Sequence, residues 1–270
     1  MSTHSVTRRL TTLDLLKMRQ QGEKIVMLTS YDATFAALSE AAGVDILLIG
    51  DSLGMVLQGH DSTLPVSMDD MVYHTTAVAR GARRPLICAD MPFGSSQISP
   101  AETFRNAARL MASGAQMVKI EGGHEMVETV RFCTSRGIPV CAHIGLTPQS
   151  VHQLGGYRVQ GKDEAAARRL VEEAHALEAA GAAIVLLEAV PAAVADAVTA
   201  ALHVPTIGIG AGKGTSGQVL VVYDMLDLTV GKKPRFVKNF MAGATSPLEA
   251  VAAYVKAVKD GSFPGPEHGY

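Results

Sequence analysis

The sequence predicts an α/β fold: a single-domain (β/α)8 TIM barrel with a short N-terminal helix. Eight short runs of branched apolar residues, which are typical of buried parallel strands, alternate with helical segments along the chain. The chain also has 270 residues, of which 47% are hydrophobic, and it has no linker that would divide it into two domains. The length and the number of strands together favour a closed barrel over an open doubly wound sheet.

The elements are assigned from apolar periodicity and from the turn residues between them. A leading helix is expected over residues 11–21, with Leu13, Leu16 and Met18 on one face. The predicted strands are, in chain order, 24–32, 44–49, 84–90, 116–122, 138–145, 183–189, 205–212 and 218–226. The other helices are expected at 33–42, 67–81, 99–114, 124–137, 162–181, 191–202 and 248–261.

Capping residues support several of these helix boundaries. Asp32 is placed as the N-cap of the helix that follows the first strand. Ser99 and Glu102 have the spacing of a capping box. Ser246 and Glu249 repeat that spacing before the last helix. We therefore expect one domain over residues 1–270, with its core at about 23–260 and flexible tails at both ends, the second being SFPGPEHGY.

Composition and charge exclude several classes of partner. Charged residues make up 19% of the chain and the formal net charge is -2, so no basic field for nucleic acid or a membrane surface is expected. The opening residues lack the apolar stretch of a signal peptide, and no apolar run is long enough to span a membrane. Cys88, Cys133 and Cys141 have no CxxC spacing and are interpreted as buried, reduced residues. These features predict a cytoplasmic protein with small-molecule partners.

Ionisable side chains follow five of the predicted strands. They are Asp51, Asp90, Glu121, His143 and Glu188. In a (β/α)8 barrel the carboxyl ends of all strands meet at the face that holds the active site. Helix capping would explain any one of the acids, but glutamate is a poor N-cap and capping therefore does not account for Glu121 and Glu188. The sequence thus predicts an acidic pocket at this face.

The acids favour a hard cation as a ligand of the pocket. Carboxylate oxygens suit Mg²⁺, which takes few protein ligands and keeps places for water and substrate oxygens. Zinc is disfavoured because His143 is the only histidine at a strand end and no cysteine lies near one. Lys119 lies two residues before Glu121, so both side chains point to the same side of their strand. A buried lysine there would bind a substrate anion or pair with one of the acids, and both roles are compatible.

A glycine-rich stretch follows the seventh predicted strand. Residues 207–218, IGIGAGKGTSGQ, contain a GxGxxG match, but it is not at a strand-to-helix turn of a dinucleotide-binding unit, and no GK[ST] occurs. We therefore reject a nucleotide-binding fold and expect this stretch to line the mouth of the barrel with backbone, where it could touch a ligand.

Eight motifs in order connect the chain to a known family: VMLTSYDA, GDSLGMVLQGH, ADMPFGS, VKIEGG, AHIGLTPQS, LLEAVP, IGIGAG and QVLVVYDML. Over roughly residues 8–260 the chain resembles the ketopantoate hydroxymethyltransferase (3-methyl-2-oxobutanoate hydroxymethyltransferase) family. One departure is Asp227, since the family usually has Gly-Leu after YDML. The resemblance implies pantothenate and coenzyme A biosynthesis, and a homo-oligomer, commonly a decamer.

The resemblance also implies roles for the strand-end residues. Asp51 and Asp90 would bind Mg²⁺, with Glu121 as a third ligand, directly or through water. The 2-oxo acid would contact Asp51, Ser52, Asp90 and Lys119, and Glu188 would be the catalytic base. His143 would orient a ligand or relay a proton.

The implied reaction transfers a hydroxymethyl group from 5,10-methylenetetrahydrofolate to 3-methyl-2-oxobutanoate through a Mg²⁺-stabilised enolate, giving 2-dehydropantoate. Glu188 ends an apolar run, so we expect desolvation to raise its pKa toward that of a base. One alternative is a Mg²⁺-dependent C–C lyase or aldolase that acts on another 2-oxo acid and needs no folate. A non-catalytic barrel is the other alternative, but it predicts loss of pocket acids, and all are present.

Overall fold

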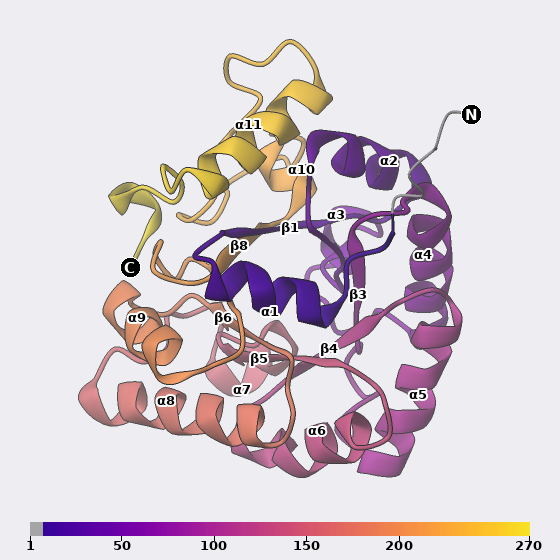
Figure 1. Cartoon of the computed structure of the whole chain (residues 1–270), viewed down its shortest axis with the longest axis vertical. Helices are drawn as coiled ribbons and strands as arrows, with labels where there is room; N and C mark the ends of the chain where they lie inside the picture. Colours follow the sequence, from indigo (N-terminus) through magenta and orange to yellow (C-terminus); the bar gives the residue numbers. More distant parts are fainter. Residues whose placement is uncertain (1–7) are drawn as a thin grey trace.

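Eight parallel strands pair in chain order and close on themselves, because β1 is hydrogen-bonded to both β2 and β8 (Figure 1). The computed structural model describes residues 8–270, and the predicted N-terminal tail at residues 1–7 lies outside the described residues. The strands are β1 Ile25–Thr29, β2 Ile46–Ile49, β3 Leu86–Asp90, β4 Met117–Glu121, β5 Val140–Gly145, β6 Ile184–Glu188, β7 Thr206–Ile209 and β8 Gly217–Leu220. The closed barrel confirms the predicted fold class.

Helices surround this barrel (Figure 1). The α-helices of the described residues are α1 Thr12–Gln20, α2 Ala33–Ala42, α3 Leu53–Val56, α4 Met68–Gly81, α5 Pro100–Ala112, α6 Val127–Thr134, α7 Val151–Leu154, α8 Glu164–Ala179, α9 Ala192–Ala201, α10 Val222–Met225 and α11 Pro247–Lys259. Three short 3₁₀ helices are η1 His124–Met126, η2 Pro148–Ser150 and η3 Pro266–His268. Within residues 8–270, no helix has both the length and the apolar character that crossing a membrane would require.

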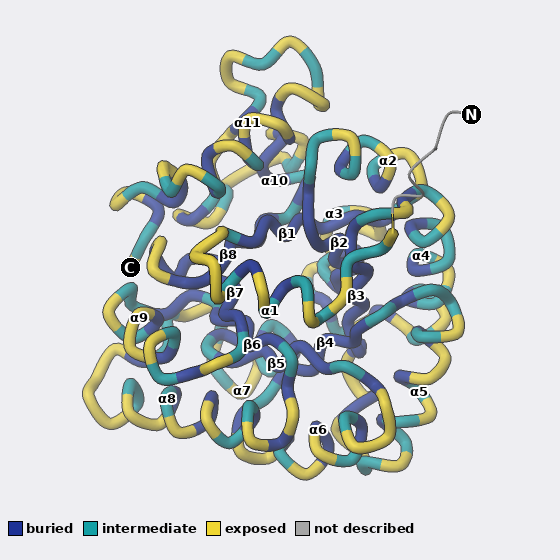
Figure 2. The backbone as a smooth tube through the Cα atoms, viewed as in Figure 1, coloured by how far each residue is buried: buried dark blue, intermediate teal, exposed yellow. Residues whose placement is uncertain are grey.

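The core consists of the strands and the helix faces that cover them (Figure 2). Nearly every strand residue is buried, because the barrel encloses one face of the sheet and helices cover the other. The two exceptions are Gly145 and Glu188, which end β5 and β6. All three cysteines are buried and unpaired, as predicted.

The predicted N-caps are confirmed, but the capping boxes at α5 and α11 are not formed. Asp32 accepts a hydrogen bond from the backbone N–H of Phe35 at 2.9 Å. Ser99 and Ser246 likewise cap α5 and α11 through their hydroxyl oxygens. In α11, the Glu249 carboxylate accepts a hydrogen bond from the backbone N–H of Thr245 at 2.8 Å. It does not accept one from the backbone N–H of the N-cap Ser246, so the reciprocal half of the capping box is not formed.

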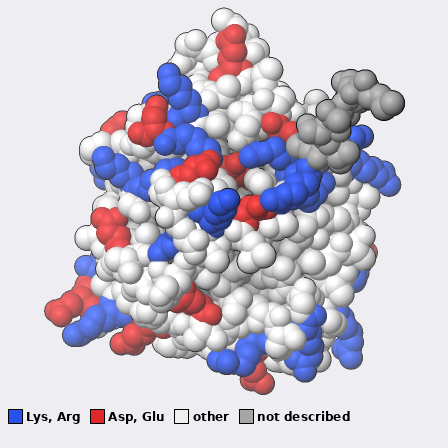
Figure 3. All heavy atoms as spheres, viewed as in Figure 1, with Lys and Arg blue, Asp and Glu red and all other residues white. Residues whose placement is uncertain are grey.

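Helix α1 lies across the amino end of the barrel (Figure 1). The predicted apolar face is confirmed at Met18, which is buried, and Leu16 is half-buried, but it was wrong at Leu13, which is 74% exposed, because Leu15 is buried instead. Leu15 and Met18 are three residues apart and therefore lie on one side of the helix. Arg19 ties the helix down by donating to the backbone oxygen of Thr199 at 2.7 Å. Figure 3 shows basic and acidic side chains interspersed on this face of the molecule, without a continuous basic patch.

The glycine-rich stretch differs from the prediction. Strands β7 and β8 are parallel and are joined without a helix, so residues 210–216 themselves return to the amino end of the barrel. There Lys24 donates to the backbone oxygen of Lys213 at 3.0 Å. Glycine is needed because a Cβ at Gly212 would lie 2.6 Å from the Cβ of Ala192 in α9. Most of this stretch therefore packs against α9 instead of lining the mouth.

Strand β8 is shorter than predicted. It ends at Leu220, and the YDM segment belongs to α10, where Asp224 is buried and accepts a hydrogen bond from the Thr229 hydroxyl at 2.6 Å. The chain then turns at Asp227, whose φ of 60° is in the left-handed region. Glycine adopts this conformation without cost and aspartate tolerates it, so the turn forms despite the departure from the family pattern.

The C-terminal segment, predicted to be loose, is packed against the barrel. Phe263 is buried, with its ring 5.4 Å from that of Phe240 and 5.9 Å from that of Tyr254. Further on, the backbone oxygen of Tyr270 accepts a hydrogen bond from the N–H of Ala192 at 3.3 Å. The segment is short and rich in glycine, proline and polar residues, so its composition suggested a loose tail. Burial of Phe263 orders it.

Candidate active site

A pocket of about 740 Å³ lies at the carboxyl ends of the strands. Its lining includes the six ionisable residues singled out at strand ends or beside them: Asp51, Asp90, Lys119, Glu121, His143 and Glu188. Ser52 lines it as well. The structure therefore brings together residues that are up to 137 positions apart in the chain, at the face where (β/α)8 barrels place their active sites.

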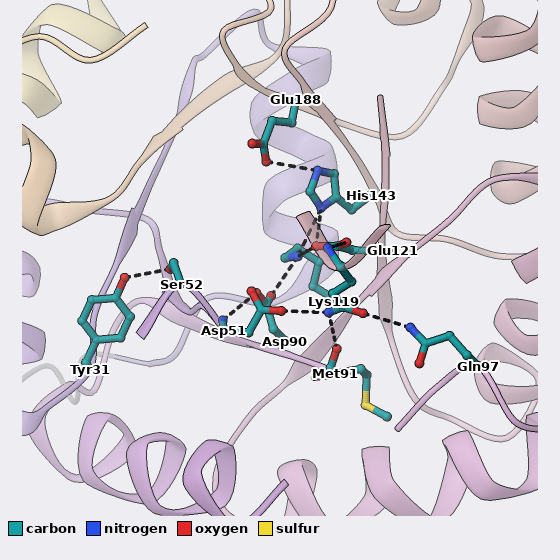
Figure 4. A network of polar contacts seen from close by, with 11 residues as sticks. Tyr31, Asp51, Ser52, Asp90, Met91, Gln97, Lys119, Glu121, His143 and Glu188 are labelled. Atoms are coloured by element: carbon teal, nitrogen blue, oxygen red, sulfur yellow. Dashed lines mark hydrogen bonds and ion pairs between the residues drawn. The ribbon is translucent and has the colours of Figure 1, made fainter. Parts of the chain in front are cut away.

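Strand register makes these residues neighbours. Asp90 pairs with Lys119 across β3 and β4, and Glu121 pairs with His143 across β4 and β5. Glu188 is the partner of Gly145 across β5 and β6, and a Cβ at Gly145 would clash with the backbone oxygen of Glu188, so glycine lets the two strands approach there. Figure 4 shows the resulting row of side chains, with Lys119 between the acids and His143 between Glu121 and Glu188.

Lys119 is the central cation of the pocket. Its Nζ lies 3.2 Å from Asp90 Oδ1, 3.5 Å from Glu121 Oε1 and 3.2 Å from His143 Nδ1. The residue is only 4% exposed. Burial by itself lowers the pKa of Lys119, but the negative charges of the neighbouring acids outweigh burial and raise that pKa well above its usual value. The internal ion pair considered from the sequence is thus present, and the ammonium still faces the pocket.

Asp51 and Asp90 form a closely spaced pair of carboxylates. Asp90 Oδ2 accepts a hydrogen bond from the backbone N–H of Asp51 at 3.0 Å. Burial, followed by the charges of Asp90 and Glu121, raises the pKa of Asp51 well above its usual value. Burial also raises the pKa of Asp90, although Lys119 opposes the shift. The two groups are therefore costly to ionise together unless a cation joins them.

Glu121 and His143 are held in their charged forms. Burial would raise the pKa of Glu121, but Lys119 and His143 reverse the effect and lower it. His143 lies with Nδ1 3.4 Å from Glu121 Oε1 and Nε2 3.3 Å from Glu188 Oε2. Burial and Lys119 would lower the pKa of His143, but its contacts with the two glutamates raise that pKa to about 9.

Glu188 lies at the wall of the pocket and is less buried than expected. Its side chain is 16% exposed, compared with 5% or less for Asp90, Lys119 and Glu121. The strong desolvation predicted for Glu188 therefore applies to Asp51 and Asp90 instead. The partial exposure leaves one side of the Glu188 carboxylate open to the pocket, while His143 contacts Oε2.

The structure adds Gln149, which sequence reasoning missed. Its Nε2 donates to Asp51 Oδ2 and to the backbone oxygen of Met91, both at 2.8 Å, and its backbone N–H donates to Glu121 Oε2 at 3.0 Å. It lies in the motif AHIGLTPQS after β5, so its position just past a strand end was the available signal. Separately, the Tyr31 hydroxyl lies 2.9 Å from Ser52 Oγ and orients it.

The donor set fits a hard divalent cation. Asp90 Oδ1 is buried and, within the described residues, its one polar contact is the ion pair with Lys119, and the donors that face the pocket are carboxylate oxygens. Both oxygens of Glu121 already contact other groups of this chain. Within residues 8–270, no three histidine, cysteine, aspartate or glutamate side chains converge closely enough to form a complete metal site. This arrangement suits Mg²⁺, which completes its coordination with water and substrate oxygens.

The fold and the pocket together define a class: (β/α)8 barrel enzymes with an ionisable, carboxylate-rich site at the mouth of the barrel. The chain belongs to the ketopantoate hydroxymethyltransferase family, whose profile matches residues 9–266. It is 64% identical over 270 residues to 3-methyl-2-oxobutanoate hydroxymethyltransferase of Dechloromonas aromatica, covering 100% of this chain and 99% of the relative. The corresponding protein of Nitrosospira multiformis is 67% identical over 252 residues, covering 93% and 96%. The chain is thus assigned to hydroxymethyltransferases, which transfer one-carbon groups.

Solved structures of more distant proteins share the fold. Phosphonopyruvate hydrolase in complex with oxalate and Mg²⁺ matches with a TM-score of 0.60 and 14% identity, covering 78% of this chain and 81% of that one. Oxaloacetate acetylhydrolase in complex with 3,3-difluorooxalacetate matches with a TM-score of 0.61 and 15% identity, covering 96% and 99%. At these identities the likeness concerns the barrel alone.

Proposed function

We propose that the chain transfers a hydroxymethyl group from 5,10-methylenetetrahydrofolate to 3-methyl-2-oxobutanoate, giving 2-dehydropantoate. The observation that best supports this reaction is the convergence of a paired set of aspartates, a buried lysine and an open glutamate in one pocket. Carbon–carbon bond formation next to a keto group requires a base for the C3 proton and positive charge for the developing oxyanion. This pocket has both.

Binding of the 2-oxo acid is assigned to the floor of the pocket. Asp51 and Asp90 would hold Mg²⁺, with Glu121 reached through water, and Asp51, Ser52, Asp90 and Lys119 would contact the substrate. The metal, when bound, would act as a Lewis acid toward the keto and carboxylate oxygens of the substrate. Lys119 adds a fixed positive charge next to the keto oxygen, in surroundings where burial strengthens its effect.

Glu188 is assigned as the base that removes the C3 proton. Its carboxylate is open to the pocket on one side and is held on the other by His143 at 3.3 Å. The proton passes from C3 to Glu188, and the negative charge moves to the keto oxygen beside Lys119. The imidazole of His143 lies between Glu188 and Glu121, so it orients the base and shields it from the second acid.

The net reaction balances with one water molecule. C3 loses a proton and gains a bond to the one-carbon unit, and water supplies the new hydroxyl group. Both carbon–nitrogen bonds of the donor's methylene bridge break, and the C3 proton and one proton of the water end on the two folate nitrogens. Family membership of the whole chain supports the particular acceptor.

The variant Glu188→Gln tests the base. With Mg²⁺ and 3-methyl-2-oxobutanoate but no folate, the parent protein is expected to exchange the C3 hydrogen with deuterated water, and Glu188→Gln is expected to slow exchange by about 10²–10⁴-fold. Binding of the oxo acid, measured by calorimetry, should persist. Normal exchange by the variant would rule out Glu188 as the base. If the parent protein instead cleaved or formed a carbon–carbon bond of a 2-oxo acid in folate-free buffer, a Mg²⁺-dependent C–C lyase would be favoured.

A further inference from the structure

The pocket has far more space than the acceptor needs. A cavity of about 740 Å³ is in the range of about 300–1,000 Å³ that holds drug-sized ligands, whereas the acceptor has five carbon atoms. The residues assigned to the acceptor occupy the floor at the ends of β2 to β6. The remaining wall is formed by the loops after β2, β5, β6 and β8 and by Tyr270.

This outer wall has two cations that the proposed chemistry does not use. Arg158 and Lys232 both line the pocket and are exposed. Within residues 8–270, neither side chain is part of an ion pair or donates a hydrogen bond. Lys233, which follows Lys232 and also lines the pocket, forms an ion pair with Asp227. A pocket whose floor is acidic thus has a rim with uncompensated positive charge.

Contacts of neighbouring residues bring the segments that carry the two cations to the ends of β6 and β7, and Glu188 is the last residue of β6. The N–H of Gln160 donates to the backbone oxygen of Ala189 at 2.9 Å, so the segment that contains Arg158 runs beside the end of β6. At the end of the neighbouring strand β7, Phe236 and Tyr270 pack against Gly210. The basic segment 232–235 leads into Phe236, so it follows the same edge of the pocket.

Aromatic side chains line the same pocket as these cations. Tyr157, Phe236 and Tyr270 line the pocket, and the rings of Tyr157 and Tyr270 are partly exposed to it. Aromatic and apolar walls suit the flat rings of a pteridine and an aminobenzoyl group. Carboxylates at the far end of such a ligand would then reach the rim.

The geometry points to Arg158 and Lys232 as the binding site for the glutamate carboxylates of the reduced folate donor, with the donor's rings against Tyr157, Phe236 and Tyr270. This assignment rests on the proposed function, since it takes the folate as the donor. It places the one-carbon unit on the side of the pocket where Glu188 removes the proton. Two other acids line the pocket. Asp61 belongs to the loop after α3, on the β2 side of the mouth, and Asp224 is buried and accepts a hydrogen bond from the Thr229 hydroxyl.

Steady-state kinetics with two donors test the assignment. The donors are 5,10-methylenetetrahydrofolate and 5,10-methylenetetrahydropteroate, which lacks the glutamate. We expect Arg158→Gln and Lys232→Gln each to raise KM for the folate by about fivefold, with larger effects at low ionic strength. The double variant should show about a 25-fold rise, while KM for the pteroate, KM for the oxo acid and C3 hydrogen exchange stay at the parent values.

A matched control separates local from general effects of charge. Lys256→Gln removes an exposed lysine of α11 that does not line the pocket, and it should leave both donor constants unchanged. An unchanged folate KM in the double variant, or an equal rise for folate and pteroate, would overturn the assignment. Failure of the parent protein to use the folate at all would refute the proposed function instead, so the two failures are distinguishable.

Discussion

Replacing Lys119 by methionine tests how the pocket is held together. The substitution keeps an unbranched side chain but removes the ammonium that lies 3.2 Å from Asp90 and 3.5 Å from Glu121. Both acids are buried, so water cannot replace the lost charge, and within residues 8–270 the remaining cation in contact with Glu121 is His143. Breaking a buried ion pair from one side costs about 3–5 kcal/mol. We expect Lys119→Met to lower the free energy of unfolding by that amount in the absence of metal.

A double-mutant cycle with Glu121→Gln measures the interaction itself. Urea unfolding would be followed for the parent, both single variants and the double variant, in EDTA and at one protein concentration. Because Glu121→Gln removes one of the stranded charges, the double variant should be more stable than the sum of the single effects predicts, by about 1–3 kcal/mol. Lys256→Met, at an exposed site, should change stability by less than about 0.5 kcal/mol. A similarly small effect of Lys119→Met would refute the reasoning.

Two further predictions concern the residues around Asp51. Burial raises the pKa of Asp51 in the folded chain, so the folded chain retains a proton that the unfolded chain releases. The free energy of unfolding therefore falls as the pH rises above the pKa that Asp51 has in the unfolded chain. In EDTA, Asp51→Asn should therefore raise the thermal midpoint more at pH 7 than at pH 4 while activity is lost; the same gain at both values would contradict this. Gln149→Leu removes the side-chain bonds to Asp51 and Met91 and should weaken Mg²⁺ binding by about 10–100-fold in calorimetry. Gln97→Leu, which loses a bond to Gln149 but none to Asp51, should bind Mg²⁺ more tightly than Gln149→Leu, and equal affinities would argue against the positioning role.

Several features were predictable because they depend on local sequence pattern. Apolar runs identified the strands, and each strand begins within two residues of its predicted start. The turn residue Asp32 marked the start of α2, where it is the N-cap. Where local signals were ambiguous, the prediction failed: Leu13 and Leu15 are two residues apart, and only packing against the barrel decided which one is buried.

Other features depend on the path of the chain in space. The stretch 210–216 was expected at the mouth but returns to the amino end, because no helix connects β7 to β8. The segment around Phe263 was expected to be loose but is ordered by apolar contacts with distant residues. Gln149 was overlooked because glutamine has no charge to mark it, and its role depends on reaching both Asp51 and Glu121.

The sequence by itself determined the barrel and the identity of the acids at its mouth. Parallel strands in a closed barrel all end at one face, so the residues that follow them must meet there whatever their separation in the chain. Only the tertiary structure decided how they pair: that Lys119 lies between Asp90 and Glu121, that His143 joins Glu121 to Glu188, and that Tyr270 closes the wall. Those contacts depend on strand register and on the paths of loops, which are set by packing across the whole molecule and not by any local pattern of residues.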